Sequence, residues 1–168
     1  MALVSPMVRT ALFVSDIERS ARFYEEILEI TEVYAVGSLV HETAPKLLGM
    51  PPNTYVQYKI LRSAGLNKGM VGLFEVSDPS PPTVAKRKEG CNIGETCLVF
   101  YCGDLDVVYE RLTDNGHHIV SPPLLLEVEI DDGAVKKNEG GAGMREMTFR
   151  DPDGVMINLI EQDPASED

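Results

Sequence analysis

Val14-Ser15-Asp16-Ile17-Glu18 predicts where the first helix begins, and the recurrence of this stretch later in the chain decides the fold. Ser15 followed three residues later by Glu18 is typical of a capping box. In this motif the hydroxyl accepts a hydrogen bond from an unpaired backbone amide and the carboxylate reaches back to the cap. Apolar residues then recur at helical spacing, namely Ile17, Ala21, Tyr24 and Leu28. The residues before the cap, 7–14, are expected to form a strand.

The second half of the chain repeats the first. Asp104-Leu105-Asp106 lies 88 positions after Asp16-Ile17-Glu18, and Asn158-Leu159 lies 86 positions after Gly72-Leu73. Such nearly equal offsets at both ends of a β-α-β-β-β unit indicate an internal duplication. The two halves are therefore expected to share one topology.

Three signals divide the second copy into elements. Asp104 is expected to cap the helix, and Asn115-Gly116 is expected to end it. Pro122-Pro123 is expected to stop a short strand at 119–120 before another strand at 124–130. The other predicted strands are 32–36, 54–61 and 69–76 in the first copy and 96–102, 145–150 and 155–161 in the second.

The predicted fold class is α+β, with two tandem β-α-β-β-β modules that form a curved mixed sheet around a cleft. The modules, 5–77 and 95–163, are joined by a linker at 78–94 that contains Asp78-Pro79-Ser80-Pro81-Pro82, and they make a single domain over 1–168. The strand at 96–102 is apolar on both faces. This pattern predicts that helix covers one face and that the other face encloses a small-molecule cleft.

Composition and charge exclude several classes of partner. The chain has 168 residues and a formal net charge of −12, from 15 Lys and Arg against 27 Asp and Glu. Such a field repels phosphate backbones and anionic lipids, so neither nucleic acid nor membrane is expected as a partner. The short basic cluster Lys86-Arg87-Lys88 is followed by Glu89 and is interpreted as a solvated linker. Three cysteines without CxxC spacing, and an N-terminus without a secretory signal, predict a cytoplasmic protein.

Several stretches resemble a known family. In the first half they are Ala11-Leu12-Phe13-Val14-Ser15-Asp16-Ile17-Glu18-Arg19-Ser20 and Phe23-Tyr24. In the second half they are Asp104-Leu105-Asp106-Val107-Val108-Tyr109-Glu110-Arg111-Leu112, Gly116, Val120-Ser121-Pro122-Pro123 and Phe149-Arg150-Asp151-Pro152-Asp153-Gly154-Val155-Met156-Ile157-Asn158-Leu159-Ile160-Glu161. Together they resemble the glyoxalase/bleomycin-resistance/dioxygenase group, the vicinal oxygen chelate superfamily. The resemblance implies the fold and a homodimer, but it does not fix the reaction, because one fold hosts many chemistries.

The resemblance implies four positions for metal ligands, and in this chain these positions hold Arg9, Gly72, Cys97 and Asn158. An arginine stays protonated and repels a divalent cation, and a glycine offers no side-chain ligand. The set therefore predicts that the metal has been lost, and no cofactor is expected. A one-residue shift of register is the alternative, in which a divalent metal returns. Glu75 and Glu161 each lie three residues beyond a ligand position, and this odd offset should turn them to the opposite face.

The first hypothesis is a small-molecule binder. An apolar pocket is expected to hold the body of a partly apolar, anionic ligand, while Arg9 and Asn158 orient its polar end. The residues expected to line the pocket are Phe13, Phe74, Val99, Tyr101 and Met156. Alternatively, Arg9 pairs with one of the many acidic side chains and Asn158 makes only internal hydrogen bonds.

The second hypothesis is a lyase or isomerase related to glyoxalase I or the epimerases. Arg9 would stabilise an enolate-like oxyanion, and His41, Lys59 or Glu75 would act as the base. Cys97 is a candidate nucleophile, with an inert core thiol as the alternative. His41 belongs to a long segment at 37–53 that could form a lid, with a surface location as the alternative, and for Lys59 the alternative is an exposed side chain with no role in the pocket.

Overall fold

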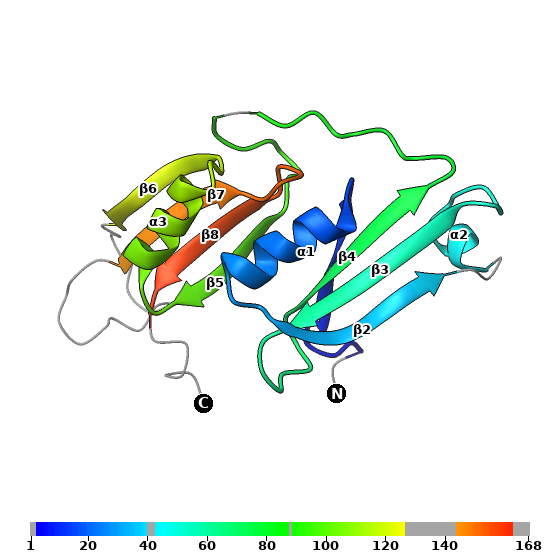
Figure 1. The fold of residues 1–168 in the computed structure, drawn as a ribbon, viewed down its shortest axis with the longest axis horizontal. Helices are drawn as coiled ribbons and strands as arrows, with labels where there is room; N and C mark the ends of the chain where they lie inside the picture. Colours follow the sequence, from blue (N-terminus) through cyan, green and yellow to red (C-terminus); the bar gives the residue numbers. More distant parts are fainter. Residues whose placement is uncertain (1–2, 40–42, 88, 127–143, 163–168) are drawn as a thin grey trace. The chain divides into compact units, whose positions relative to one another are not determined.

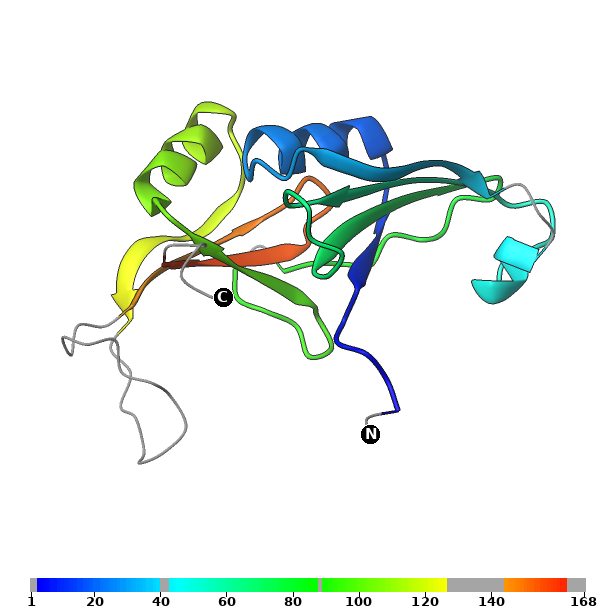
Figure 2. The ribbon, with the colours of Figure 1, turned by 90° about the horizontal axis from the view of Figure 1, so that it is seen from below.

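The computed structural model describes residues 3–39, 43–87, 89–126 and 144–162. The chain divides into two compact units, Met1–Ala85 and Lys86–Asp168. Each unit holds one four-stranded mixed sheet and one ten-residue α-helix that lies on a single face of it (Figures 1 and 2). The fold is α+β with two tandem modules, as the duplication predicted. No helix in the described ranges is long and apolar enough to cross a membrane.

The two units share one topology. Unit 1 contains β1 (Arg9–Val14), α1 (Ile17–Glu26), β2 (Glu32–Leu39), the short helix α2 (Thr43–Leu47), β3 (Tyr55–Arg62) and β4 (Met70–Ser77). Unit 2 contains β5 (Cys97–Cys102), α3 (Leu105–Asp114), β6 (Ile119–Leu126), β7 (Met144–Arg150) and β8 (Met156–Glu161). The strand orders are β1-β4-β3-β2 and β5-β8-β7-β6, and β1 and β5 each run parallel to their neighbour.

Strand alternation places the core of unit 1 between its sheet and α1. Leu12 and Val14 of β1 and Leu73 of β4 are buried on the helix side of the sheet, whereas Phe13 is exposed. The apolar stripe of α1 supplies the other half of this core, with Ile17, Ala21, Phe23 and Tyr24 buried. Leu28 lies beyond the end of α1, so the helix is shorter than its apolar pattern predicted.

The cap of α1 is Asp16 and not Ser15, so the predicted capping box is wrong by one residue. Asp16 has an extended backbone, and its Oδ1 accepts a hydrogen bond from the amide of Arg19 at 2.9 Å. The Ser15 hydroxyl instead accepts from Arg19 Nη2 at 2.8 Å. In unit 2 the predicted cap is confirmed, because Asp104 Oδ1 accepts from the amides of Asp106 and Val107.

Strand β6 corrects the prediction of a break at Pro122-Pro123. The structure shows one strand, Ile119–Leu126, that passes through both prolines. Its pairing with β7 shifts register between Ser121 and Leu124, on either side of the prolines. Proline is tolerated here because β6 is an edge strand, where one side of the backbone has no strand to pair with.

Each unit fixes the start of its helix with a glutamate from its last strand. Glu75 Oε2 accepts a hydrogen bond from the amide of Ile17 at 2.8 Å, and Glu161 Oε1 accepts from the amide of Leu105 at 3.3 Å. Both carboxylates lie at the positive end of a helix dipole, which stabilises negative charge. This placement confirms that Glu75 and Glu161 face the helix side, opposite to Gly72 and Asn158 on the same strands.

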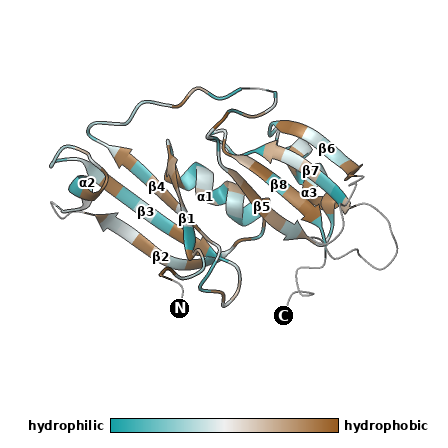
Figure 3. Ribbon diagram, turned by 180° about the vertical axis from the view of Figure 1, so that it is seen from behind, coloured by the Kyte–Doolittle hydropathy of each residue, from teal (hydrophilic) through white to brown (hydrophobic). Residues whose placement is uncertain are grey.

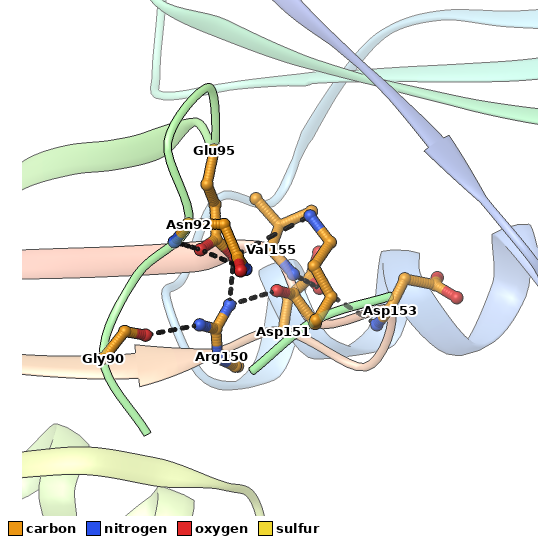
Figure 4. Close-up of polar contacts among 9 residues, drawn as sticks. Gly90, Asn92, Glu95, Arg150, Asp151, Asp153 and Val155 are labelled. Atoms are coloured by element: carbon orange, nitrogen blue, oxygen red, sulfur yellow. Dashed lines mark hydrogen bonds and ion pairs between the residues drawn. The ribbon is translucent and has the colours of Figure 1, made fainter. Parts of the chain in front are cut away.

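A buried ion pair ties the segment before β5 to the β7–β8 turn (Figure 4). Arg150 Nη1 lies 2.5 Å from Glu95 Oε1, and the two side chains are only 4% and 3% exposed. Arg150 also donates to the carbonyl oxygens of Gly154 at 2.7 Å and Gly90 at 2.9 Å. Asp151 shapes the turn, since its Oδ1 accepts from the amides of Asp153 and Val155. Residues 90–95 are therefore fixed to unit 2.

Because of this ion pair, the fold is expected to lose stability as the pH falls. The Arg150 guanidinium, helped by the amide of Asn92, lowers the pKa of Glu95 to about 2. The unfolded chain therefore takes up a proton at higher pH than the folded chain, and acid favours unfolding between about pH 5 and pH 2. Urea unfolding followed by circular dichroism across this range is expected to show a flatter pH dependence for Glu95→Gln than for the parent.

The matched control for this titration is Glu110→Gln on the exposed side of α3, which is expected to keep the parent slope. A residual slope is expected in Glu95→Gln, because Arg62 lowers the pKa of Glu32 in the same direction in unit 1. If Glu95→Gln retains the full acid dependence of the parent, the Arg150–Glu95 pair is not its source.

Candidate functional site

The sheet of unit 1 has one face that α1 does not cover. We call this the unit 1 open face and define it by Arg9, Phe13, Tyr58, Gly72 and Phe74. Arg9 and Phe13 alternate along β1 with the buried Leu12, and both are exposed. The pairing of β1 with β4 and of β4 with β3 brings Phe13, Phe74 and Tyr58 into one row across the sheet. Arg9, Phe13 and Phe74, which the sequence assigned to one pocket, thus share one face of the unit 1 sheet.

The Phe74 ring has the rings of Phe13 and Tyr58 as neighbours and approaches Gly72 together with Arg9. The Phe74 ring centroid lies 6.2 Å from that of Phe13 and 6.2 Å from that of Tyr58. A Cβ atom at Gly72 would lie 3.0 Å from Cε2 of Phe74 and 3.6 Å from Cδ of Arg9. The missing side chain therefore leaves the space that the Phe74 ring and the stem of Arg9 occupy.

Arg9 carries an uncompensated charge on this face. Within the described residues its side chain forms no hydrogen bond or ion pair, although the chain has 27 acidic side chains. Glu75, the carboxylate of the neighbouring strand β4, is turned to the helix side and accepts a hydrogen bond from the amide of Ile17. The alternative that Arg9 serves as the partner of an acidic side chain therefore finds no support in the described part of the chain.

Unit 2 has a corresponding open face with a different character. Val99 is 57% exposed and Tyr101 41% exposed on β5, so the helix of unit 2 covers only one face of this strand. Leu98, which faces the opposite side, is buried, because the helix-facing side of the sheet holds the core of unit 2. Figure 3 shows β5 as apolar along most of its length. Met156 of β8 is half-buried on the same side as Asn158.

Asn158 is engaged by its own unit. Its Nδ2 lies 3.1 Å from Glu146 Oε2 and 3.2 Å from Thr148 Oγ1, with the carbonyl oxygen of Met147 at 3.4 Å. These contacts take up the amide hydrogens, so Asn158 positions Glu146 and Thr148 and is not free to donate to a ligand. Sequence reasoning missed Glu146 and Thr148. Alternation within the predicted strand 145–150 places both on one face, but only the register of β7 with β8 brings them to Asn158.

Two of the three candidate bases, Lys59 and Glu75, lie away from the unit 1 open face. Lys59 Nζ pairs with Glu25 Oε1 of α1 at 2.9 Å and is largely buried, so the expectation of an exposed side chain is wrong. Glu75 binds the helix amide described above. Both side chains therefore point to the helix side of the sheet. His41 lies outside the described residues.

Cys97 has the environment of an unreactive thiol. Partial burial raises its pKa, and the nearby Glu95 charge acts in the same direction. Its Sγ donates to the carbonyl oxygen of Leu98 at 3.7 Å. The thiolate is the nucleophilic form, so a raised pKa makes Cys97 a poor nucleophile near neutral pH.

The residues at the four family ligand positions do not fit a divalent metal. Arg9 and Gly72 offer a cation and a bare backbone on the unit 1 open face. In unit 2, Cys97 holds its proton more tightly than usual, and the Asn158 amide nitrogen is bonded to Glu146. Among the described residues, no group of three or more His, Cys, Asp or Glu could hold a metal ion.

Comparison with known proteins identifies the class to which this fold belongs. The family model of the Glyoxalase/Bleomycin resistance protein/Dioxygenase superfamily matches residues 7–159. The chain therefore belongs to this superfamily, as its resemblance implied. Comparison with curated protein sequences gives no match.

Solved structures of the same fold are similar over nearly the whole chain. A glyoxalase family protein from Bacillus cereus is 18% identical, with a TM-score of 0.63 over 96% of this chain and 95% of that one. TnmS3, an antibiotic binding protein from Streptomyces sp. CB03234, is 18% identical, with a TM-score of 0.53 over 97% and 100%. A mutant of glyoxalase I from Zea mays is 15% identical, with a TM-score of 0.59 over 94% of this chain and 45% of that one. At these identities the similarity shows the fold alone.

Proposed function

We propose that this protein binds a small, partly apolar, anionic molecule on the unit 1 open face without a metal ion. The observation that carries the proposal is the side chain of Arg9, which has no partner within the described residues and whose Cδ approaches Gly72 together with the ring of Phe74. A guanidinium binds a carboxylate or similar oxyanion through two parallel hydrogen bonds, and neighbouring apolar surface strengthens this contact by excluding water.

The charge of the chain makes the position of Arg9 selective. The net charge of −12 makes the protein as a whole repel anions. Binding of an anionic ligand is therefore favoured at a cationic side chain, such as Arg9, that has no carboxylate partner within the described residues. Glu75 of β4 and Lys59 of β3 are turned to the helix side, and Arg62 at the end of β3 is paired with Glu32. Arg9 therefore acts on this face without competition from them.

The donor set supports binding without a metal. An arginine and a glycine stand where the family places two ligands, and the remaining two residues are a protonated thiol and an internally bonded amide. The similarity to TnmS3, which is an antibiotic binding protein, supports a binding role as one use of this fold. The expected homodimer stays a prediction.

Chemistry of the lyase or isomerase type has weaker support. Of the three candidate bases, Lys59 is paired with Glu25 and Glu75 is bound to the first amide of α1, while His41 lies outside the described residues. We therefore argue the binding function alone and treat turnover as an outcome of its test.

Titration calorimetry with 2-naphthoate and its neutral amide, 2-naphthamide, tests the anchoring role of Arg9. The acid is expected to bind the parent more tightly than the amide, and Arg9→Ala is expected to weaken it by about tenfold or more. The affinity of the amide is expected to change little, because it brings no charge to pair with. Arg22→Ala, which removes an exposed arginine of α1, is the matched control and is expected to leave both affinities unchanged.

Two outcomes would overturn the proposal. One is an Arg9→Ala variant that binds 2-naphthoate as tightly as the parent does. The other is a stoichiometric metal, retained after dialysis with Mn²⁺, Fe²⁺, Ni²⁺ or Zn²⁺ and required for binding, as measured by elemental analysis. Conversion of the bound acid to a product would move the protein to the enzyme class.

A further inference from the structure

We propose that the unit 1 open face is a stacking platform that selects a planar aromatic carboxylate. This inference rests on the proposed function and names the class of ligand. It starts from one row of residues across the sheet, in which Phe13, Phe74, Tyr58 and Gly37 are successive strand partners. Three aromatic side chains and one glycine thus span all four strands of unit 1 on the side away from α1.

Two glycines determine how these rings lie. A Cβ atom at Gly37 would lie 3.1 Å from the hydroxyl oxygen of Tyr58 and 3.3 Å from its Cζ. A Cβ atom at Gly72 would lie 3.0 Å from Cε2 of Phe74. Each ring therefore occupies the space of a missing side chain and lies low over the neighbouring backbone.

Neither glycine is needed for its backbone conformation. Gly37 and Gly72 have no positive φ, whereas Gly49, Gly65 and Gly69 of the same unit do. Any residue could adopt the strand conformation at positions 37 and 72, so glycine there makes room for the rings. A ring that lies low over a strand turns a face outward.

The rings form one row. The planes of Tyr58 and Phe74 are inclined by 31° with centroids 6.2 Å apart, and Phe13 continues the row at the same spacing with its plane inclined by 49° to that of Phe74. Tyr58 and Phe74 are half-buried, so their positions are held by the sheet, while Phe13 is 53% exposed. A planar aromatic ligand can contact several of these rings at once, whereas a puckered ring system of the same size cannot lie flat against them.

Arg9 supplies the polar end of the platform. Its Cδ lies 3.6 Å from the Cβ position of Gly72, so its stem runs beside the Phe74 ring. Its guanidinium has no partner within the described residues. This charge is complementary to a carboxylate and sets the orientation of a ligand that stacks on Phe74.

The test compares 2-naphthoate with decahydro-2-naphthoate, which has the same carbon skeleton and charge but saturated, puckered rings. Calorimetry is expected to show that the parent prefers the planar acid by about two- to tenfold, the range for aromatic contacts beyond area burial. Tyr58→Leu and Phe74→Leu are expected to remove this preference while both acids still depend on Arg9.

Gly37→Ala is the most specific variant, because it keeps all three aromatic side chains and only shifts the outer end of the Tyr58 ring away from the strand. It is expected to weaken binding of 2-naphthoate and to leave the affinity for decahydro-2-naphthoate unchanged. Gly65→Ala is no suitable control, since its positive φ adds strain, so Ala35→Ser on β2 serves as the matched change of similar size. Thermal melts by circular dichroism establish that each variant is folded.

The outcomes separate the platform from the proposed function. Equal affinity for the two acids, with both weakened by Arg9→Ala, overturns the platform and leaves the binding function standing. An unchanged planar preference in folded Gly37→Ala and in both leucine variants also overturns it. If neither acid responds to Arg9→Ala, the proposed function fails first, whatever the preference between the acids.

Discussion

Arg150→Leu is expected to lower the thermal midpoint of unfolding by roughly 10 °C. The substitution removes the guanidinium and leaves the Glu95 carboxylate, only 3% exposed, without its cation. It also leaves the carbonyl oxygens of Gly90 and Gly154 without a donor. Removing one member of a buried ion pair lowers the stability of the fold much more than replacing both members with apolar residues does, because it leaves a buried charge without a partner.

The double variant Arg150→Leu/Glu95→Leu tests this cause. It is expected to recover part of the lost midpoint, because no charge is then left buried. Arg87→Leu is the matched control in the exposed segment before β5 and is expected to melt with the parent. If the double variant melts below Arg150→Leu, the loss comes from packing and not from an unpaired carboxylate.

Phe149→Ala is expected to reduce the free energy of unfolding by about 3–5 kcal/mol. The Phe149 side chain is fully buried in β7, next to Arg150 but on the opposite, helix-facing side of the sheet. Removing the ring forfeits its burial and leaves a cavity that the surrounding side chains only partly fill. Urea denaturation at neutral pH measures the change.

The control for this core prediction is Val107→Ala, which truncates an exposed side chain of α3. We expect this variant to lose less than about 1 kcal/mol. A Phe149→Ala protein as stable as Val107→Ala would mean that unit 2 repacks around the gap, contrary to a well-packed core.

The sequence predicted the topology because the duplication is local and periodic. Residues that begin β1 and β5, Arg9 and Cys97, are 88 positions apart, and those that begin β4 and β8, Met70 and Met156, are 86 apart. The same offset pairs Asp16 with Asp104 and so already pointed to the true cap of α1. The prediction of Ser15 as the cap was wrong because Ser15 and Asp16 are adjacent and both are residue types that cap helices.

The site was predictable only as far as strand alternation reaches. Alternation placed Arg9 with Phe13, and it turned Glu75 away from Gly72, as the structure has them. Alternation within one strand says nothing about which residues of other strands or helices are neighbours. The pairing of Lys59 with Glu25, and the row that joins Tyr58 to Phe74, depend on helix packing and strand register.

The paired glutamates of the last strands have a consequence for how this fold can change. Each of these strands anchors its helix through one set of alternating residues, ending in Glu75 or Glu161, and presents the other set to solvent or ligand. Substitutions at Phe74, on the face proposed to bind the ligand, are therefore expected to leave the helix anchor at the adjacent Glu75 in place. Such a strand carries the residues that can change on one face and the residues that hold the helix on the other. Directed evolution of new ligand specificity should therefore begin at the residues that face away from the helix.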